Sequence, residues 1–150
     1  MVALQRTTGS DSRLAPLIRE LDQDLRTRYG ATQALYAPFN LVKDESPFVI
    51  VLDEDGTPIG CGSFRPYDDS SIEIKRMFVS PDARRRGVGQ AVIGELEGWA
   101  RERGFTVAIL ETGTAQHEAI ALYERCGYAR TEAFPPYVGM PVSVCMRKVL

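Results

Sequence analysis

The segment 72–90, IEIKRMFVSPDARRRGVGQ, constrains the fold more than any other part of the chain. Its first half, Ile72 to Val79, is rich in apolar and β-branched residues, which predicts a buried strand that Pro81 and Asp82 end. A turn rich in arginine and glycine, 84–89, follows and leads into an amphipathic helix. Glycines let a ligand approach the backbone, and the first N–H groups of a helix attract anions. The segment therefore predicts a phosphate-binding turn, to which arginines add charge-assisted hydrogen bonds.

The turn lacks the patterns of two common nucleotide-binding loops. It is neither G-x-G-x-x-G nor G-x-x-x-x-G-K-[ST], so neither a dinucleotide nor a nucleoside triphosphate is indicated. A net charge of −2, from 18 basic and 20 acidic residues, argues against a nucleic-acid-binding protein. Cys61, Cys126 and Cys145 are widely spaced and form no C-x-x-C, so we expect neither a disulfide framework nor a metal site.

The length and hydropathy of the chain indicate one cytoplasmic domain. A chain of 150 residues is long enough to bury one core, so we expect a single domain over residues 1–150. The N-terminus has no apolar segment typical of a signal peptide, and no apolar run is long enough to span a bilayer. We therefore expect no membrane partner.

The order of the predicted elements indicates a mixed α/β (α+β) fold. An antiparallel meander precedes the arginine turn, and the strand–helix–strand order from 72 to 110 implies a right-handed crossover between two parallel strands. We expect a sheet of about six to seven strands with about four flanking helices. The predicted strands are 2–6, 48–52, 59–64, 72–79, 106–110, 128–134 and 142–149. One helix is predicted over 10–29, a second begins at Val88 and is ended by Gly104, and a third runs from 114 to 127. Residues 31–46 are predicted to form a loop that can include a short helix.

Two motifs resemble those of one enzyme superfamily. Arg84, Gly87 and Gly89 match R/Q-x-x-G-x-G/A, the pyrophosphate-binding signature of the GNAT N-acetyltransferases. Residues 119–128, AIALYERCGY, resemble the A-x-x-L-Y-x-x-x-G-F/Y segment of the same superfamily at the expected distance along the chain. The element order is also similar, and the resemblance covers roughly residues 47–149.

The resemblance implies transfer of an acetyl group from acetyl-CoA to a primary amine, by direct attack in a ternary complex. A bulge would splay the strand 72–79 from its parallel neighbour at the cofactor cleft and aim the Met77 N–H at the thioester carbonyl. The edge of that strand would hold the pantetheine arm, and the turn with the helix start would hold the pyrophosphate. The implied cofactor-binding residues are Met77, Phe78, Val79, Arg84, Arg85, Arg86, Gly87, Val88, Gly89, Gln90, Gln116, Ala119 and Tyr123.

The resemblance also implies two catalytic side chains. Glu73 stands where several GNAT enzymes place a general base, and Tyr123 where they place the proton donor to the leaving thiolate. Two alternatives stay open, because Glu73 can instead pair with Lys75 or Arg76 and Tyr123 can be a core tyrosine. Gln116 stands where GNAT chains often have an asparagine that contacts the cofactor arm.

The acceptor is the least defined part of the prediction. We expect its site beside the 31–46 segment and the 134–137 loop, with Tyr36, Phe39, Glu73, Phe134 and Tyr137 as substrate-binding residues. A small-molecule amine is the first choice. Acetylation of a protein N-terminus or lysine, and a non-catalytic acetyl-CoA sensor, are the alternatives. The apolar strand 142–149 is available to pair across a homodimer.

Overall fold

A computed structural model of the chain describes residues 2–150. Within them, one seven-stranded sheet has the order β1-β2-β3-β4-β5-β7-β6 and is covered by three α-helices. The strands are β1 (Ala3–Thr8), β2 (Pro47–Leu52), β3 (Pro58–Pro66), β4 (Ser71–Val79), β5 (Val107–Gly113), β6 (Ala129–Arg130) and β7 (Ser143–Val149). The helices are α1 (Ala15–Tyr29), α2 (Val88–Glu102) and α3 (His117–Arg125), and the 3-10 turns are η1 (Ser12–Leu14), η2 (Gly30–Leu35), η3 (Ala37–Asn40) and η4 (Pro81–Ala83).

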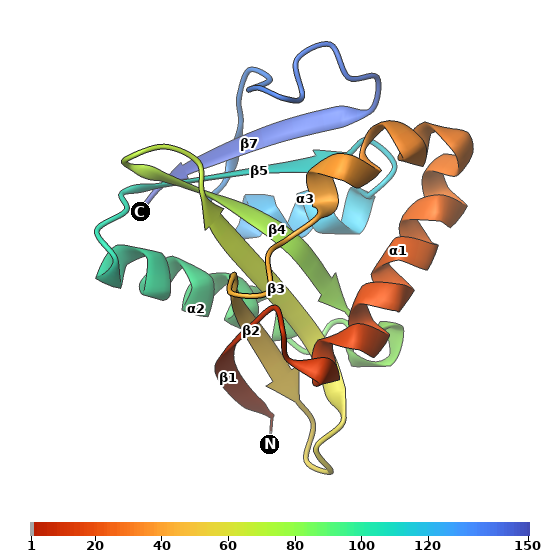
Figure 1. The fold of residues 1–150 in the computed structure, drawn as a ribbon, viewed down its shortest axis with the longest axis vertical. Helices are drawn as coiled ribbons and strands as arrows, with labels where there is room; N and C mark the ends of the chain where they lie inside the picture. The colour runs from red at the N-terminus through yellow and green to blue at the C-terminus, as the bar shows by residue number, and fades with distance from the viewer. Residues whose placement is uncertain (1) are drawn as a thin grey trace.

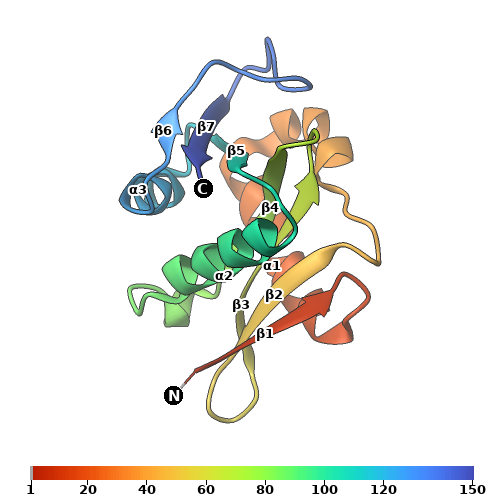
Figure 2. The same ribbon diagram turned by 90° about the vertical axis from the view of Figure 1, so that its left-hand side faces the viewer.

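The helices cover the sheet from both sides. Helices α2 and α3 lie on one face and α1 lies on the other, as the two views show (Figure 1, Figure 2). The apolar residues of β2 alternate accordingly. Val49 and Val51 pack with α2, whereas Phe48 and Ile50 pack with α1. This period-2 alternation is what a strand buried on both faces requires.

The sheet has the predicted mixed topology. Strands β1 to β4 pair antiparallel in sequence, and β4 pairs with β5 in parallel across the α2 crossover. Strand β7 then pairs antiparallel with β5 along its whole length and with the short β6 on its other side. The fold class predicted from the sequence is thus confirmed.

Two segments differ in detail from the sequence prediction. The strand expected over 128–134 shrinks to β6. Thr131 N still donates to Cys145 O at 2.9 Å, and the chain then leaves β7 for the loop that contains Pro135 and Pro136. The 31–46 segment forms the 3-10 turns η2 and η3, so three α-helices and these turns stand where about four helices were expected.

Strand β4 contains the bulge that the resemblance implied. Cys61 of β3 faces Phe78 and Ser63 faces Lys75, so Arg76 and Met77 together oppose Gly62. Arg76 takes a left-handed φ of 58°, as a bulge residue can. The extra residue reverses the alternation of β4, since Ile74 packs with α2, but Phe78 packs with α1.

The bulge coincides with the separation of β4 from β5. Their pairing runs from Ser71↔Val107 to Ile74↔Leu110 and stops there, although β4 continues to Val79 and β5 to Gly113. The two strands diverge beyond this point, and α3 is visible behind the gap (Figure 1). The side of β4 beyond Ile74 is therefore free of strand pairing toward β5.

No helix among residues 2–150 combines the length and apolarity that crossing a membrane would need.

We predict that Gly62→Ala destabilises the protein through the bulge. A methyl group there would meet Met77 Sδ, Val92 Cγ1 at 2.8 Å and Leu96 Cδ1 at 3.0 Å. Such overpacking lowers the free energy of unfolding by about 1–3 kcal/mol, measurable by urea denaturation.

The matched control is Gly94→Ala on the exposed side of α2, where the added methyl meets nothing within 4 Å. It should raise the free energy of unfolding by about 0.5–1 kcal/mol, because alanine favours a helix interior. Equal stability of the two variants would contradict the close packing at the bulge.

Candidate active site

A small polar pocket lies at the opening between β4 and β5. It has a volume of about 80 Å³, and residues of α1, β4, β5 and α3 all contribute to its wall. Its polar lining is formed by Tyr29, Gln33, Tyr36, Asn40, Lys75, Arg76, Glu111, Thr112, Gln116 and Tyr123. Met77, the second residue of the bulge, also lines it.

The start of α2 has the geometry of an anion site. Gly87, the N-cap residue, is left-handed with φ 76° and supplies no capping side chain, and Arg85 is also left-handed with φ 64°. Ala91 N donates to Gly87 O at 3.0 Å. The N–H groups from Val88 to Gln90 donate to no described residue, so they remain available to a ligand.

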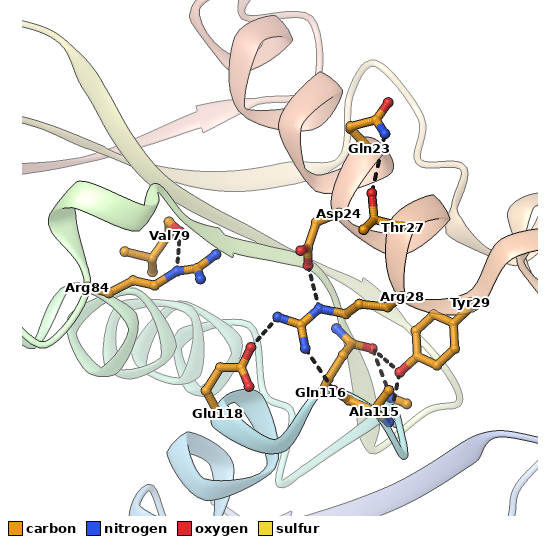
Figure 3. A network of polar contacts seen from close by, with 11 residues as sticks. Gln23, Asp24, Thr27, Arg28, Tyr29, Val79, Arg84, Ala115, Gln116 and Glu118 are labelled. Carbon is orange, nitrogen blue, oxygen red and sulfur yellow. Dashed lines mark hydrogen bonds and ion pairs between the residues drawn. The ribbon is translucent and has the colours of Figure 1, made fainter.

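The arginines of this turn are exposed, but Arg84 is tied to the end of β4 and Arg86 to the turn between β2 and β3. Arg84 Nε donates to Val79 O at 3.0 Å, and its guanidinium lies over the Phe78 ring at 5.8 Å (Figure 3). Arg86 Nη2 lies 3.5 Å from Asp53 Oδ1. The predicted phosphate-binding turn is thus anchored to the free end of β4.

Gly89 of the same motif has a packing role. A Cβ built on it would lie 2.8 Å from Leu122 Cδ2 of α3. The glycine therefore allows α2 and α3 to approach each other closely beside the opening, and Ala119 packs against the same core.

A polar network joins the end of α1 to the loop before α3 (Figure 3). Gln116 Oε1 accepts from Gly113 N at 2.9 Å and from Tyr29 Oη at 3.2 Å. Arg28 donates to Asp24 Oδ2 at 2.9 Å and to a backbone carbonyl of the loop at 2.7 Å, and it pairs with Glu118. The carboxamide oxygen of Gln116 thus organises the loop, which leaves its nitrogen end for a ligand.

Tyr123 reaches the pocket from α3. Its ring packs in the core of the α2 face, but its hydroxyl makes no hydrogen bond within residues 2–150. No fully buried polar side-chain atom in this part of the chain lacks a partner, so the hydroxyl must open into the pocket. Burial, with smaller contributions from Cys126 and Glu111, raises the pKa of Tyr123 and keeps the phenol protonated as a donor.

Glu73 is buried and fully engaged. Its side chain is 1% exposed. Oε1 accepts from Arg65 at 3.0 and 3.1 Å, Oε2 accepts from Tyr137 Oη at 2.7 Å, and Lys75 Nζ lies 3.6 Å away. Glu73 is not among the residues that line the pocket. The ion pair with Lys75 that the sequence left open is present.

Lys75 is one of two cations at the pocket wall, together with Arg76. Nζ donates to Tyr137 Oη at 2.8 Å and lies 3.5 Å from Asn40 Oδ1. Burial lowers the pKa of Lys75, an effect that the negative charge of Glu73 opposes.

The predicted acceptor residues gather on the α1 face, but they divide into two groups. Tyr36 lines the pocket, where its hydroxyl accepts from Val142 N at 3.0 Å. Phe39 and Phe134 pack edge-to-face on Tyr137, with ring centroids 5.9 and 5.5 Å apart. These three rings support the pocket from behind and do not line it.

Glu111 lines the pocket and was missed in the sequence. Ser143 Oγ donates to its Oε2 at 2.7 Å, and burial raises the pKa of Glu111 to about 7. The available signal was a carboxylate directly after the apolar run 107–110, where a strand buried on both faces has no reason to carry one.

Residues 2–150 contain no cluster of three or more His, Cys, Asp or Glu side chains placed to hold a metal ion.

The site fits the parts of a coenzyme A thioester. The free N–H groups of α2 suit a pyrophosphate, the unpaired side of β4 suits an extended amide arm, and Tyr123 lines the pocket beside them. These are the requirements of an acyl-CoA-dependent acetyltransferase. A family model of the acetyltransferase (GNAT) family matches residues 15–128, and the chain belongs to that family.

Individual relatives agree with this membership. An IAA acetyltransferase of Azospirillum brasilense is 35% identical over 151 residues, covering 99% of this chain and 98% of the relative. A crystal structure of a Klebsiella pneumoniae protein of the acyl-CoA N-acyltransferase type has a TM-score of 0.85 at 31% identity, covering 100% and 98%. A Bacillus anthracis protein of the streptothricin acetyltransferase type, solved with acetyl coenzyme A, shares the fold with a TM-score of 0.63 at 23% identity, covering 75% and 67%.

We predict that Gly87→Ala weakens acetyl-CoA binding about tenfold. The residue is left-handed, and an L side chain in that conformation costs about 1–2 kcal/mol, which would reshape the turn at the start of α2. Isothermal titration calorimetry with acetyl-CoA measures the change.

The control is Gly104→Ala, which places the same strain, at φ 89°, just beyond the far end of α2. Its affinity for acetyl-CoA should equal that of the wild type. Equal affinities of all three proteins would show that the turn does not hold the cofactor.

Proposed function

We propose that this acetyltransferase moves the acetyl group of acetyl-CoA to the primary amine of a small molecule, by direct attack in a ternary complex. One observation carries the proposal. The pocket at the β4–β5 opening is lined from the α3 side by Tyr123 and from the α1 side by Tyr36 and Lys75. Direct attack needs the acceptor and acetyl-CoA to meet at one point, and this pocket is a place that both can reach.

The cofactor side of the proposal uses the elements of the α2 face. The helix start would bind the pyrophosphate, the edge of β4 from Met77 to Val79 would bind the pantetheine amides, and the Met77 N–H would stabilise the developing oxyanion. The bulge supports this role, since it frees this part of β4 from pairing with β5.

The surroundings of the pocket support a small acceptor. Its walls come from the end of α1, the η2 and η3 turns and the two strands. A protein N-terminus or lysine would need an open approach past these turns. The name of the relative that is 35% identical points the same way, since IAA is a small molecule.

The test is release of coenzyme A thiol over a series of acceptors: spermidine, L-lysine, streptothricin, IAA and a peptide with a free N-terminus and a lysine. Turnover of a small amine supports the proposal. Turnover of the peptide alone would indicate that the acceptor is a protein N-terminus or lysine and not a small molecule. Tight binding of acetyl-CoA without turnover of any acceptor favours a sensor domain.

We predict that Tyr123→Phe lowers kcat at least about 100-fold, because the leaving thiolate loses its proton donor. Binding of acetyl-CoA should change little, since the phenyl ring keeps its core packing. Stopped or continuous thiol-release kinetics at saturating acetyl-CoA measure the loss.

The control is Tyr128→Phe. That neighbouring ring packs against Tyr123 at 6.1 Å, and its hydroxyl donates to Glu97 at 2.8 Å, away from the pocket. It should lose stability but keep kcat. A normal kcat in Tyr123→Phe would remove the phenol from the mechanism.

A further inference from the structure

We infer that Glu111, rather than Glu73, takes the proton from the ammonium group of the acceptor. The inference rests on the proposed function and names the residue that makes the amine nucleophilic. An amine in its ammonium form has no free electron pair, so a base must take a proton from it before the nitrogen can attack.

Glu111 stands at the apex of the β4–β5 opening. Ile74 and Leu110 form the last pair between the strands, so Lys75 and Glu111 are the first residues beyond it. Leu110 packs on the α2 face, and the side chain of Glu111 therefore points to the α1 face. Glu111 and Tyr123 reach the pocket from opposite faces of the sheet. This places a proton acceptor on the amine side and a proton donor on the thiolate side.

One carboxylate oxygen of Glu111 is free to act. Oε2 accepts from Ser143 Oγ, which fixes the orientation of the carboxylate. Oε1 accepts no hydrogen bond from residues 2–150. Because no fully buried polar side-chain atom there lacks a partner, Oε1 must be open to the pocket that Glu111 lines.

Glu73 has no such oxygen. Arg65 occupies Oε1, and Tyr137 occupies Oε2. To accept a proton from a substrate, Glu73 would have to break a buried ion pair and a buried hydrogen bond, which is costly. Its structural role is to neutralise Arg65 and Lys75 and to hold the Tyr137 ring behind the pocket.

The surroundings adjust Glu111 for this task. Burial raises its pKa to about 7, Ser143 and Lys75 oppose that rise, and Glu73 adds to it. A base with such a pKa is partly ionised near neutral pH and still binds a proton well. The titratable groups that face it are Glu73 and Lys75 on β4, Cys145 on β7, Tyr123 on α3, Tyr29 on α1 and Tyr137 in the loop before β7.

Every proton in the acetyl transfer is accounted for. The ammonium group gives one proton to Glu111, and the amine attacks the carbonyl carbon of the thioester. A C–N bond forms and the C–S bond breaks, while Tyr123 gives its proton to the thiolate and regains one from the attacking nitrogen. The nitrogen keeps its third proton in the amide, and Glu111 releases the first to water.

The test compares Glu111→Gln with Glu73→Gln, using the amine of the acceptor series with the highest turnover. In the wild type, kcat/KM should rise with pH through about 7, the pKa of Glu111. Glu111→Gln should lose at least about 100-fold at pH 7, and its deficit should shrink at higher pH as more of the amine is already neutral. Glu73→Gln should keep the rise and move it to slightly lower pH, because the charge of Glu73 no longer adds to the pKa of Glu111.

The control Glu124→Gln, on the exposed side of α3, should behave as the wild type. Loss of the rise at 7 in Glu73→Gln, with its retention in Glu111→Gln, would overturn the inference. Acetyl-CoA binding without turnover of any amine by the wild type would instead overturn the proposed function, so the two failures are distinguishable.

A second readout needs no acceptor. Because the pKa of Glu111 is raised in the folded protein, the folded state binds more protons than the unfolded state between about 4.5 and 7, and stability falls as pH rises through this window. Glu111→Gln removes this loss. Its Tm relative to the wild type should therefore rise between pH 4.5 and 7 and stay constant above. A Tm difference independent of pH would contradict a raised pKa at this position.

Discussion

The end of strand pairing after Ile74 and Leu110 is the constraint on which the rest of this structure depends. The bulge at Arg76 and Met77 twists β4 away from β5, and the backbone groups beyond it lose a partner that a closed sheet would supply. Such groups stay in place only where a ligand or water satisfies them. The α2 turn, the pocket and α3 are all arranged around this one opening in the sheet.

The opening also places the proton donor and the charged side chains of the site on opposite faces of the sheet. Tyr123 enters from the face of α2 and α3, where burial keeps its proton on. Lys75 and Glu111 enter from the face of α1, with Glu73 buried behind them and its partner Arg65 partly exposed. Buried charges of this kind contribute little net stability and are costly when broken, so their presence here is better explained by chemistry than by folding.

Much of the fold could be predicted from the sequence, but less of the site. The turn at Gly87 and the motif around Tyr123 are local in sequence, so their spacing was enough to place them. The engagement of Glu73 was not predictable, since its partner Tyr137 lies 64 residues away and reaches it only through tertiary folding. Glu111 was missed because the apolar run 107–110 before it is typical of a buried strand. Only the divergence of β4 and β5 opens a pocket beside the Glu111 side chain.

The contacts of Arg28 and Tyr29 with the loop at Gln116 join the first third of the chain to the last third across the opening (Figure 3). One side of this link belongs to the acceptor wall, and the other precedes the helix that carries Tyr123. If cofactor binding moves this link and thereby changes the affinity for the acceptor, reciprocity requires the acceptor to change the affinity for the cofactor by the same factor. A few hydrogen bonds would then connect the two proposed binding sites.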